Sequence, residues 1–337
     1  MWKLILLANL SAVVAYVSPF HNWHCIDIVK NIDMNKPYAY NVGDLPLVSW
    51  FDNKEPMTTL NICRHMGSKL DKGKVDDGCL ICPFHGIRHS EKDAFGTTMI
   101  HEGKLWWSYE PLHKKPPSTP FYDSKKYNSI MFDMVMDANI KDCMYNTFDI
   151  NHFAFVHNDL FGNNAPPTNY KYKLHNEGKL SITYKYKTNP TIAKFKKGLD
   201  EFHNYQVFDY PYSSISVLSL KKSEKIVVHV NAYPLAIDKT KIIVTLSHNF
   251  WTSFFGKMKV KALIQYILTQ DKVQLANQAK ESMLKHSCTE KVFLKNENHF
   301  KDLNKIFKGY RYPDTIEVMK LYQKHVTPTE KKNETMK

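Results

Sequence analysis

Arginine is scarce in a chain that is strongly basic. The net charge of +13 over 337 residues comes from an excess of lysine, and the arginines are Arg64, Arg88 and Arg311. The lysines are spread widely, whereas a nucleic-acid-binding surface needs basic side chains clustered on one face. We therefore expect no nucleic-acid partner. The basic surface could instead steer an acidic protein partner toward the molecule.

Long apolar runs are also lacking. The run over residues 4–17 is interrupted by Asn9 and Ser11, and a membrane-spanning helix needs about 20 apolar residues. The run fits the apolar region of a signal peptide better. We interpret residues 1–20 as an apolar leader or a membrane tether. The alternative is an apolar strand or helix that covers the first domain.

The sequence contains no G-x-G-x-x-G motif, no other flavin or nicotinamide fingerprint and no internal repeat. The chain is therefore not expected to bind a flavin or nicotinamide cofactor itself. Six cysteines are present, but their spacing does not indicate a disulfide scaffold. Four of them have no assigned role: Cys25, Cys79, Cys143 and Cys288.

The other two cysteines lie in short pairs with histidine, Cys63-x-His65 and Cys82-x-x-His85. Two thiolates can hold one iron of a [2Fe–2S] cluster while two neutral imidazoles hold the other. A tetrahedral zinc site is the competing interpretation. Zinc fingers usually keep their cysteines in one pair and their histidines in another. Here each pair is mixed, as two loops that grip a two-iron cluster from opposite sides would require.

With these loops the chain resembles the Rieske non-haem iron oxygenases, whose loops read like CRHMG and CPFHG. The resemblance begins near His21 and continues through the expected strand at residues 45–50. It implies that Cys63, His65, Cys82 and His85 bind a [2Fe–2S] cluster. The chain departs from the family at Ile87, where tryptophan is usual.

A second motif, Asp149-x-x-His152-x-x-x-x-His157, resembles the catalytic iron motif of the same family. The resemblance implies that His152 and His157 bind Fe(II), which two histidines and a carboxylate hold with open positions. It also implies that Asp149 links the two metal centres by hydrogen bonds, with Asn146 as a neighbour. The alternative is a buried helix that carries two histidines by chance.

Helix geometry adds an expectation at this motif. On a regular helix His152 and His157 would lie about 140° apart, too far around the helix to share one metal. We therefore predict a break or a π-type distortion between Phe153 and Val156.

The third ligand is expected to be a carboxylate far along the chain. Asp271 is the best candidate, because its surroundings resemble the family's late Q-D-x-x-x-L-x-x-Q helix and its apolar neighbours follow a helical stripe. A solvated flank or helix cap is the alternative role for such a residue. Asp200, Glu201 and Asp209 are weaker candidates.

The length and the pattern of the chain indicate two domains. We expect a Rieske [2Fe–2S] domain at 21–117, a mononuclear-iron catalytic domain at 118–326 and a polar tail at 327–337, with a proline-rich hinge at 114–120. The expected fold class is α+β, with an N-terminal β-sandwich. The resemblance implies that the C-terminal domain is an antiparallel sheet that wraps a long helix, a helix-grip fold. Expected strands lie at 129–136, 180–186, 214–220, 226–233 and 241–250, and expected helices at 139–157 and 258–286.

The resemblance implies an oxygenase component that takes electrons from a ferredoxin or ferredoxin reductase and uses O2 to oxidise a small apolar organic substrate. A chlorophyll-type pigment is preferred, with a sterol or an alkaloid as the alternative within the family. A Rieske electron carrier without oxygenase activity is the alternative of another class. The residues expected to line an apolar pocket, or to form ordinary core, are Phe153, Phe155, Leu160, Phe161, Tyr205, Phe208 and Tyr210.

The family also implies a homotrimer in which His85 of one subunit faces Asp149 of the next. The apolar N-terminus favours a plastid or membrane-associated location, with the cytoplasm as the alternative.

Overall fold

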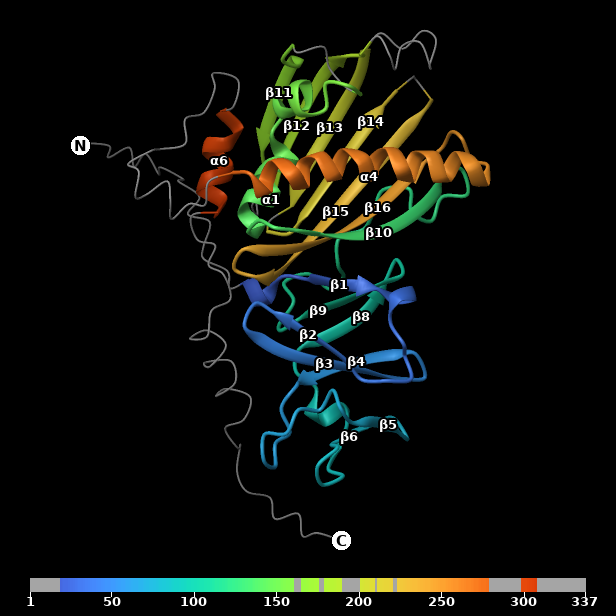
Figure 1. Cartoon of the computed structure of the whole chain (residues 1–337), viewed down its shortest axis with the longest axis vertical. Coiled ribbons are helices and arrows are strands. Elements are labelled where there is room, and N and C mark those ends of the chain that lie inside the picture. Colours follow the sequence, from blue (N-terminus) through green and yellow to red (C-terminus); the bar gives the residue numbers. More distant parts are fainter. Residues whose placement is uncertain are drawn as a thin grey trace, which may run out of the picture.

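The computed structural model describes residues 19–160, 165–175, 179–189, 201–209, 211–220, 223–278 and 298–307 (Figure 1). Residues 1–18, the tail 327–337, Asp200 and Cys288 lie outside these ranges. Within them, no helix combines the length and the apolar character that a bilayer crossing requires.

The first part of the chain forms three antiparallel three-stranded sheets, in the orders β1-β9-β8, β2-β3-β4 and β5-β6-β7. Apolar side chains of the first two sheets meet in one core that includes Leu47 and Trp107, which makes the expected β-sandwich. Phe20 is fully buried in the same core, so the first domain already includes this residue. The strands are β1 (His24–Ile28), β2 (Tyr38–Val42), β3 (Leu45–Asp52), β4 (Glu55–Leu60), β5 (Lys74–Asp76), β6 (Cys79–Ile81), β7 (Arg88–His89), β8 (Thr97–His101) and β9 (Lys104–Ser108), with 3-10 helices at Pro19–His21, Val29–Asn31 and Glu91–Asp93.

The second part of the chain is built on one antiparallel sheet of seven strands in the order β10-β16-β15-β14-β13-β12-β11. Side chains alternate between its two faces. Ile242 and Val244 join the core on the helix side of the sheet, whereas Ile243 packs against the sandwich. The strands are β10 (Asn128–Met136), β11 (Thr168–Leu174), β12 (Lys179–Lys187), β13 (Glu201–Asp209), β14 (Ser213–Ser219), β15 (Lys225–Ala236) and β16 (Lys239–His248).

A long helix, α4 (Phe254–Ala276), lies across this sheet (Figure 1). It begins at Ser253, whose hydroxyl accepts a hydrogen bond from the Gly256 N–H at 3.2 Å. Its buried side chains recur at helical spacing and face the sheet. They include Val260, Ile264, Ile267, Leu268, Asp271 and Leu275. The sheet and this helix together form the expected helix-grip architecture.

Three further helices stand at one end of the sheet: α1 (Ile140–Phe148), the one-turn α2 (His152–Val156) and α6 (Asn298–Phe307). His299 of α6 is fully buried. It lies 2.8 Å from the Tyr170 hydroxyl through Nδ1 and 3.1 Å from the Phe148 carbonyl through Nε2. These contacts hold the C-terminal end of α1, where the second histidine motif begins.

Buried polar contacts join the two halves of the molecule. The Lys241 ammonium lies 2.7 Å from the Asp27 carboxylate. The fully buried Lys104 lies 3.0 Å from Glu102 and donates to the Thr245 hydroxyl at 3.2 Å. The expected hinge at 114–120 contains Thr119, whose N–H donates to Glu102 at 2.8 Å. Pairing and hydrogen bonding offset the cost of burying these charges.

The five expected strands of the second part are present, and two further strands, β11 and β13, complete the sheet. In β11 alternating Lys and Tyr side chains are mostly exposed at the edge of the sheet. The expected helix at 139–157 is two helices separated at Asp149–Asn151, and the expected helix at 258–286 begins at Phe254 and ends at Ala276. Asp149 ends α1 and its carboxylate caps the next turn, which explains the break.

Candidate metal centres and adjoining pocket

The two Cys–His loops have the same backbone hydrogen bonds. In each loop the cysteine N–H donates to a carbonyl at the far end, and the cysteine carbonyl accepts from a glycine N–H. Both glycines have left-handed backbone, with φ of +71° at Gly67 and +70° at Gly86, which glycine adopts without steric cost. The bonds measure 2.8 and 2.9 Å for Cys63–Ser68 and Gly67–Cys63, and 2.8 and 3.0 Å for Cys82–Ile87 and Gly86–Cys82.

The sulfurs face inward and the imidazoles face outward. Cys63 and Cys82 are buried, whereas His65 and His85 are exposed, with ring centroids 4.8 Å apart. Burial raises the pKa of the Cys63 thiol. Burial acts the same way on Cys82, but backbone N–H groups of Phe84 and His85 outweigh it and lower the pKa of that thiol. Hydrogen bonds to a thiolate have this effect because they stabilise the charged form.

This arrangement bears on the choice between a cluster and zinc. A tetrahedral zinc ion would bring all four ligand atoms within about 4 Å of one another. Among the described residues, the ligand atoms of Cys63, His65, Cys82 and His85 do not form a group of three or more within 4.8 Å of one another. Paired sulfurs beside paired imidazoles fit a two-iron cluster. Ile87, at the position of the family's usual tryptophan, packs against the small core that contains Cys63 and Cys82.

The structure brings His152, His157 and Asp271 together. Oδ1 of Asp271, on α4, lies 3.4 Å from Nε2 of His152 and 3.1 Å from Nε2 of His157. The predicted distortion between Phe153 and Val156 is wrong, because α2 runs without a break over these residues. His157 follows the end of α2 with φ of −111° and ψ of 30°, and this turn away from the helix brings both rings to one point.

Several buried atoms at this point have no hydrogen-bond partner: Nδ1 and Nε2 of His152, Nε2 of His157 and Oδ1 of Asp271. Burial alone would raise the pKa of Asp271, but the two histidines lower it well below its usual range. Two imidazoles and an anionic carboxylate that converge in this way fit a divalent metal ion, and their donor set is the one typical of non-haem Fe(II).

A second layer of hydrogen bonds lies behind His157. Its Nδ1 is 2.8 Å from Oε1 of Gln270. Asp159 accepts hydrogen bonds from the Gln270 amide at 3.4 Å and from the Tyr266 hydroxyl at 2.7 Å. Such contacts fix which ring nitrogen of a ligand histidine faces the metal. Sequence reasoning missed this role of Gln270, although the residue directly precedes Asp271.

Asp149 lies beside this centre and is accessible. Its Oδ1 accepts hydrogen bonds from the N–H groups of Asn151 at 2.8 Å and His152 at 3.3 Å, and its Oδ2 is 3.9 Å from Nδ1 of His152. The side chain is 29% exposed. The carboxylate therefore caps α2 and also faces the surface next to the histidine.

The weaker ligand candidates lie elsewhere. Glu201 and Asp209 stand at the two ends of β13, in ion pairs with Lys185 at 3.3 Å and Lys179 at 3.4 Å. Asp200 lies outside the described residues.

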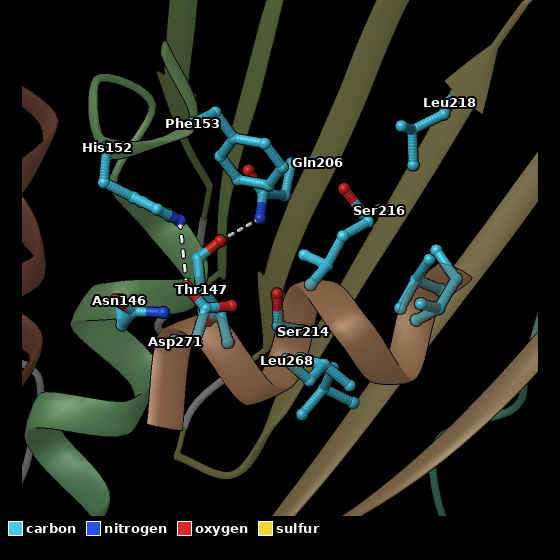
Figure 2. Close-up of a pocket in the computed structure, with 14 residues that line it drawn as sticks. Asn146, Thr147, His152, Phe153, Gln206, Ser214, Ser216, Leu218, Leu268 and Asp271 are labelled. Carbon is cyan, nitrogen blue, oxygen red and sulfur yellow. Dashed lines mark hydrogen bonds and ion pairs between the residues drawn. The ribbon is translucent and has the colours of Figure 1, made fainter. Parts of the chain in front are cut away.

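A pocket opens between the sheet and α4, directly beside His152 and Asp271 (Figure 2). The space between its lining residues, including the part that is open to solvent, measures about 590 Å³. Most of its wall is apolar, with a polar strip from α1, β13 and β14. The lining residues are Asn146, Thr147, His152, Phe153, Gln206, Ser214, Ser216, Leu218, Val228, Val230, Ile264, Ile267, Leu268 and Asp271.

Of the residues expected to line a pocket, Phe153 does so. Phe208 is buried in the core, while Phe155 and Tyr205 are 57% and 45% exposed. Phe161 and Tyr210 lie outside the described residues. Reasoning from aromatics missed the polar strip. The alternation Ser214-x-Ser216-x-Leu218 in β14, which puts all three side chains on one face, was the available signal.

Two protein-family models match the chain. The Rieske [2Fe-2S] domain matches residues 22–99, and the vanillate O-demethylase oxygenase C-terminal domain matches residues 136–298.

Among curated proteins, 3-ketosteroid-9-alpha-monooxygenase, oxygenase component, of Mycolicibacterium smegmatis is 28% identical over 40% of this chain and 42% of its own length. Pheophorbide a oxygenase of Oryza sativa subsp. japonica is 21% identical over 68% of this chain and 49% of its own length. The matches thus span less than half the length of either relative.

Solved structures share the fold. Dicamba monooxygenase bound to dicamba superposes with a TM-score of 0.70 at 15% identity, over 93% of this chain and 100% of that one. Pseudomonas putida CBB5 NdmA with caffeine gives 0.69 at 18% identity, over 85% and 89%.

Proposed function

This chain belongs to the Rieske non-haem iron oxygenases, and we propose that it is the oxygenase component of an O2-dependent monooxygenase. The observation that carries the proposal is the convergence of three unsatisfied ligand atoms, on His152, His157 and Asp271, at the wall of a largely apolar pocket. An electron carrier that used the Rieske domain alone would need neither feature.

The family's cofactors are a [2Fe–2S] cluster and mononuclear iron, and we assign their ligands as follows. Cys63 and Cys82 hold one cluster iron, while His65 and His85 hold the other. His152, His157 and Asp271 hold the ferrous ion. When bound, the cluster supplies single electrons and the ferrous ion activates dioxygen. Gln270 keeps Nε2 of His157 turned toward the metal by accepting a hydrogen bond from Nδ1.

We propose that the electron path runs between two copies of the chain. His85 is exposed on the loop between β6 and β7 of the first domain, whereas Asp149 lies at the end of α1 in the second. Figure 1 shows β6 and α1 well apart in one chain. We propose a head-to-tail homotrimer in which His85 of one subunit meets Asp149 of the next. Exposed apolar side chains are present on both sides, namely Met66 and Phe84 beside the cluster loops and Phe155 and Val273 beside α2. A ferredoxin or a ferredoxin reductase donates the electrons.

The pocket suits a compact apolar substrate that carries a polar group. Leu218, Val230 and Ile264 belong to its apolar wall, and Ser214, Ser216 and Gln206 to its polar strip. A four-ring steroid-type molecule matches the largely apolar wall, and its class is that of the ketosteroid monooxygenase relatives. We therefore propose a steroid-type substrate.

A chlorophyll-type pigment is the second candidate. The pheophorbide a oxygenase match extends over 68% of this chain, farther than the 40% of the steroid relative. A pigment macrocycle is much larger than four fused rings, and the described pocket is bounded by α4 on one side and the sheet on the other. The pigment preference from the sequence is not confirmed.

The test is anaerobic reconstitution of the full chain with iron and sulfide, followed by turnover with a ferredoxin–reductase pair under ¹⁸O₂. A steroid and a chlorophyll-type pigment are supplied in parallel, and products are analysed by mass spectrometry. We expect one ¹⁸O atom in the steroid product and none with Asp271→Asn. Incorporation of ¹⁸O into the pigment product and not the steroid product would reverse the substrate proposal. Failure of both substrates to gain ¹⁸O would contradict it. A protein that carries zinc and lacks the rhombic EPR signal of a reduced Rieske centre would overturn the cofactor assignment.

A further inference from the structure

A cluster of large apolar side chains is exposed at the beginning of α4, away from the metal ligands. Trp251, Phe254, Phe255 and Met258 are 50, 72, 77 and 49% exposed. We call these four residues the aromatic patch. Soluble proteins rarely leave such a contiguous group uncovered, and a patch of this kind usually marks an interaction surface.

The backbone holds the aromatic patch in a fixed form. Ser253 caps the helix through the Gly256 N–H. A Cβ atom at Gly256 would lie 2.2 Å from the Trp251 carbonyl oxygen, so the two segments are in close contact. Trp251 itself has a φ of +50°, a left-handed conformation that costs energy for a bulky residue. The segment therefore presents its aromatic side chains outward despite a local strain.

The segment that carries the aromatic patch is basic in sequence. Lys257 and Lys259 lie within it, and no Asp or Glu occurs between Lys239 and Gln270. The first turn of α4 contains no acidic residue, although a helix N-terminus favours negative charge. Helix stability therefore does not explain the lysines, whereas a negatively charged partner does.

We propose that the aromatic patch is a membrane-binding surface that inserts into the headgroup region of an anionic bilayer. Aromatic side chains prefer this region, and lysines beside it are attracted to anionic lipids. The contact is peripheral, because only the first turns of α4 take part. A second copy pairing through the same patch would bring lysines of like charge together. An electron donor must instead reach the cluster loops, which lie at the opposite end of the molecule beyond β5 and β6 (Figure 1).

The location of the aromatic patch also suits delivery of an apolar substrate. On α4 the pocket is lined from Ile264 to Asp271, and Met258 lies about 9 Å before Ile264 at 1.5 Å per residue. A bilayer-dissolved molecule would therefore enter near the distal end of the pocket. This route rests on the proposed oxygenase function, but the membrane contact itself does not.

Vesicle flotation of the reconstituted full-length protein tests the proposal. Vesicles of phosphatidylcholine alone are compared with vesicles that also contain phosphatidylserine. We expect the wild type to float with the phosphatidylserine vesicles. Phe254→Ser/Phe255→Ser should bind these vesicles more than about tenfold more weakly, because two aromatic side chains would no longer insert into the bilayer. In Lys257→Gln/Lys259→Gln the affinity for vesicles should fall about fivefold for each lysine replaced, and only with the vesicles that contain phosphatidylserine.

Ile237→Ser is the matched control, because Ile237 is 70% exposed on the turn between β15 and β16. It should float like the wild type. A wild type that stays unbound, or a Phe254→Ser/Phe255→Ser variant that binds normally, would overturn the proposal. So would a change of oligomeric mass in that variant, which would mark the patch as a contact between copies. Flotation does not depend on turnover, so its failure leaves the oxygenase proposal intact.

Discussion

Nδ1 of His157 lies 2.8 Å from Oε1 of Gln270, the residue directly before Asp271 in α4. One turn of helix thus supplies both a proposed metal ligand and the group that orients another ligand. The proposed ligand Asp271 and the residue that orients the proposed ligand His157 are therefore neighbours in the chain.

Gln270→Ala should weaken Fe(II) binding by about 10- to 100-fold, the usual effect of losing an outer-shell partner of a ligand histidine. The reason is that His157 would no longer be held in one ring orientation. Fe(II) titration of the protein with an intact cluster measures the effect. Gln274→Ala, at an exposed position one turn later, is the control and should bind iron normally. Unchanged affinity in Gln270→Ala would remove Gln270 from the centre.

Asp271→Asn should reduce the iron content from about three to about two atoms per chain, since it removes the anionic ligand and leaves the cluster loops untouched. Iron analysis together with the visible spectrum of the cluster checks this. The spectrum should remain that of the wild type. Retention of about three irons would show that another carboxylate is the third ligand.

Asp149→Asn should keep both metals and lose turnover coupled to the electron donor. The amide retains the oxygen that caps α2 through the Asn151 N–H, but it lacks the charge with which Asp149 faces His152. Metal content and single-turnover product yield are measured side by side. Full coupled activity in this variant would contradict the bridging role.

Ile264→Trp should shorten the pocket, because Ile264 lies farther along α4 from Asp271 than the other lining residues of that helix. Overfilling an enclosed site excludes the larger ligand first. We expect kcat/KM for a four-ring steroid to fall at least about tenfold more than for a two-ring analogue, corresponding to about 1.4 kcal/mol. Equal losses for both substrates would place the substrate outside this pocket. Iron content should be unaffected.

His299 should make the stability of the fold depend on pH. Burial lowers its pKa from 6.5 to about 4. As the pH falls from about 6.5 to about 4, the unfolded chain takes up a proton that the native imidazole does not bind. The free energy of unfolding therefore falls across this window and stops falling, for this group, below it.

Denaturant unfolding at several pH values compares wild type with His299→Gln, whose amide can still donate to the Phe148 carbonyl. The variant should show a smaller slope between about pH 6.5 and 4. His203→Gln, at an exposed position of β13, is the control for loss of a histidine. Equal slopes in wild type and His299→Gln would show that His299 does not contribute.

The sequence was most informative where ligands lie close together along the chain. The pairs at Cys63–His65 and Cys82–His85 are held by their own loops, and both loops close through hydrogen bonds of only a few residues. Asp149, His152 and His157 also lie close together along the chain. Local spacing therefore indicated the cluster motif and the histidine motif before any fold was known.

Helix periodicity failed at one of these sites for a local reason. The pattern at 139–157 reads as one helix, yet Asp149 ends the first helix and caps the second through its own carboxylate. The side chain of an aspartate competes with helical hydrogen bonds in this way. The 3.6-residue spacing of apolar side chains along a helix gives no sign of such a cap.

By itself, then, the sequence indicated the candidate cluster and histidine motifs and the α+β fold class, because short spacings and strand or helix periods are written in neighbouring residues. For Asp271 the sequence offered a candidate ligand, and the tertiary structure placed it at His152 and His157. Tertiary structure alone decided that Gln270 stands behind His157 and that Ser214 and Ser216 face the pocket. These contacts join residues that are far apart in the chain. They depend on the register of the strands and on how α4 packs on the sheet.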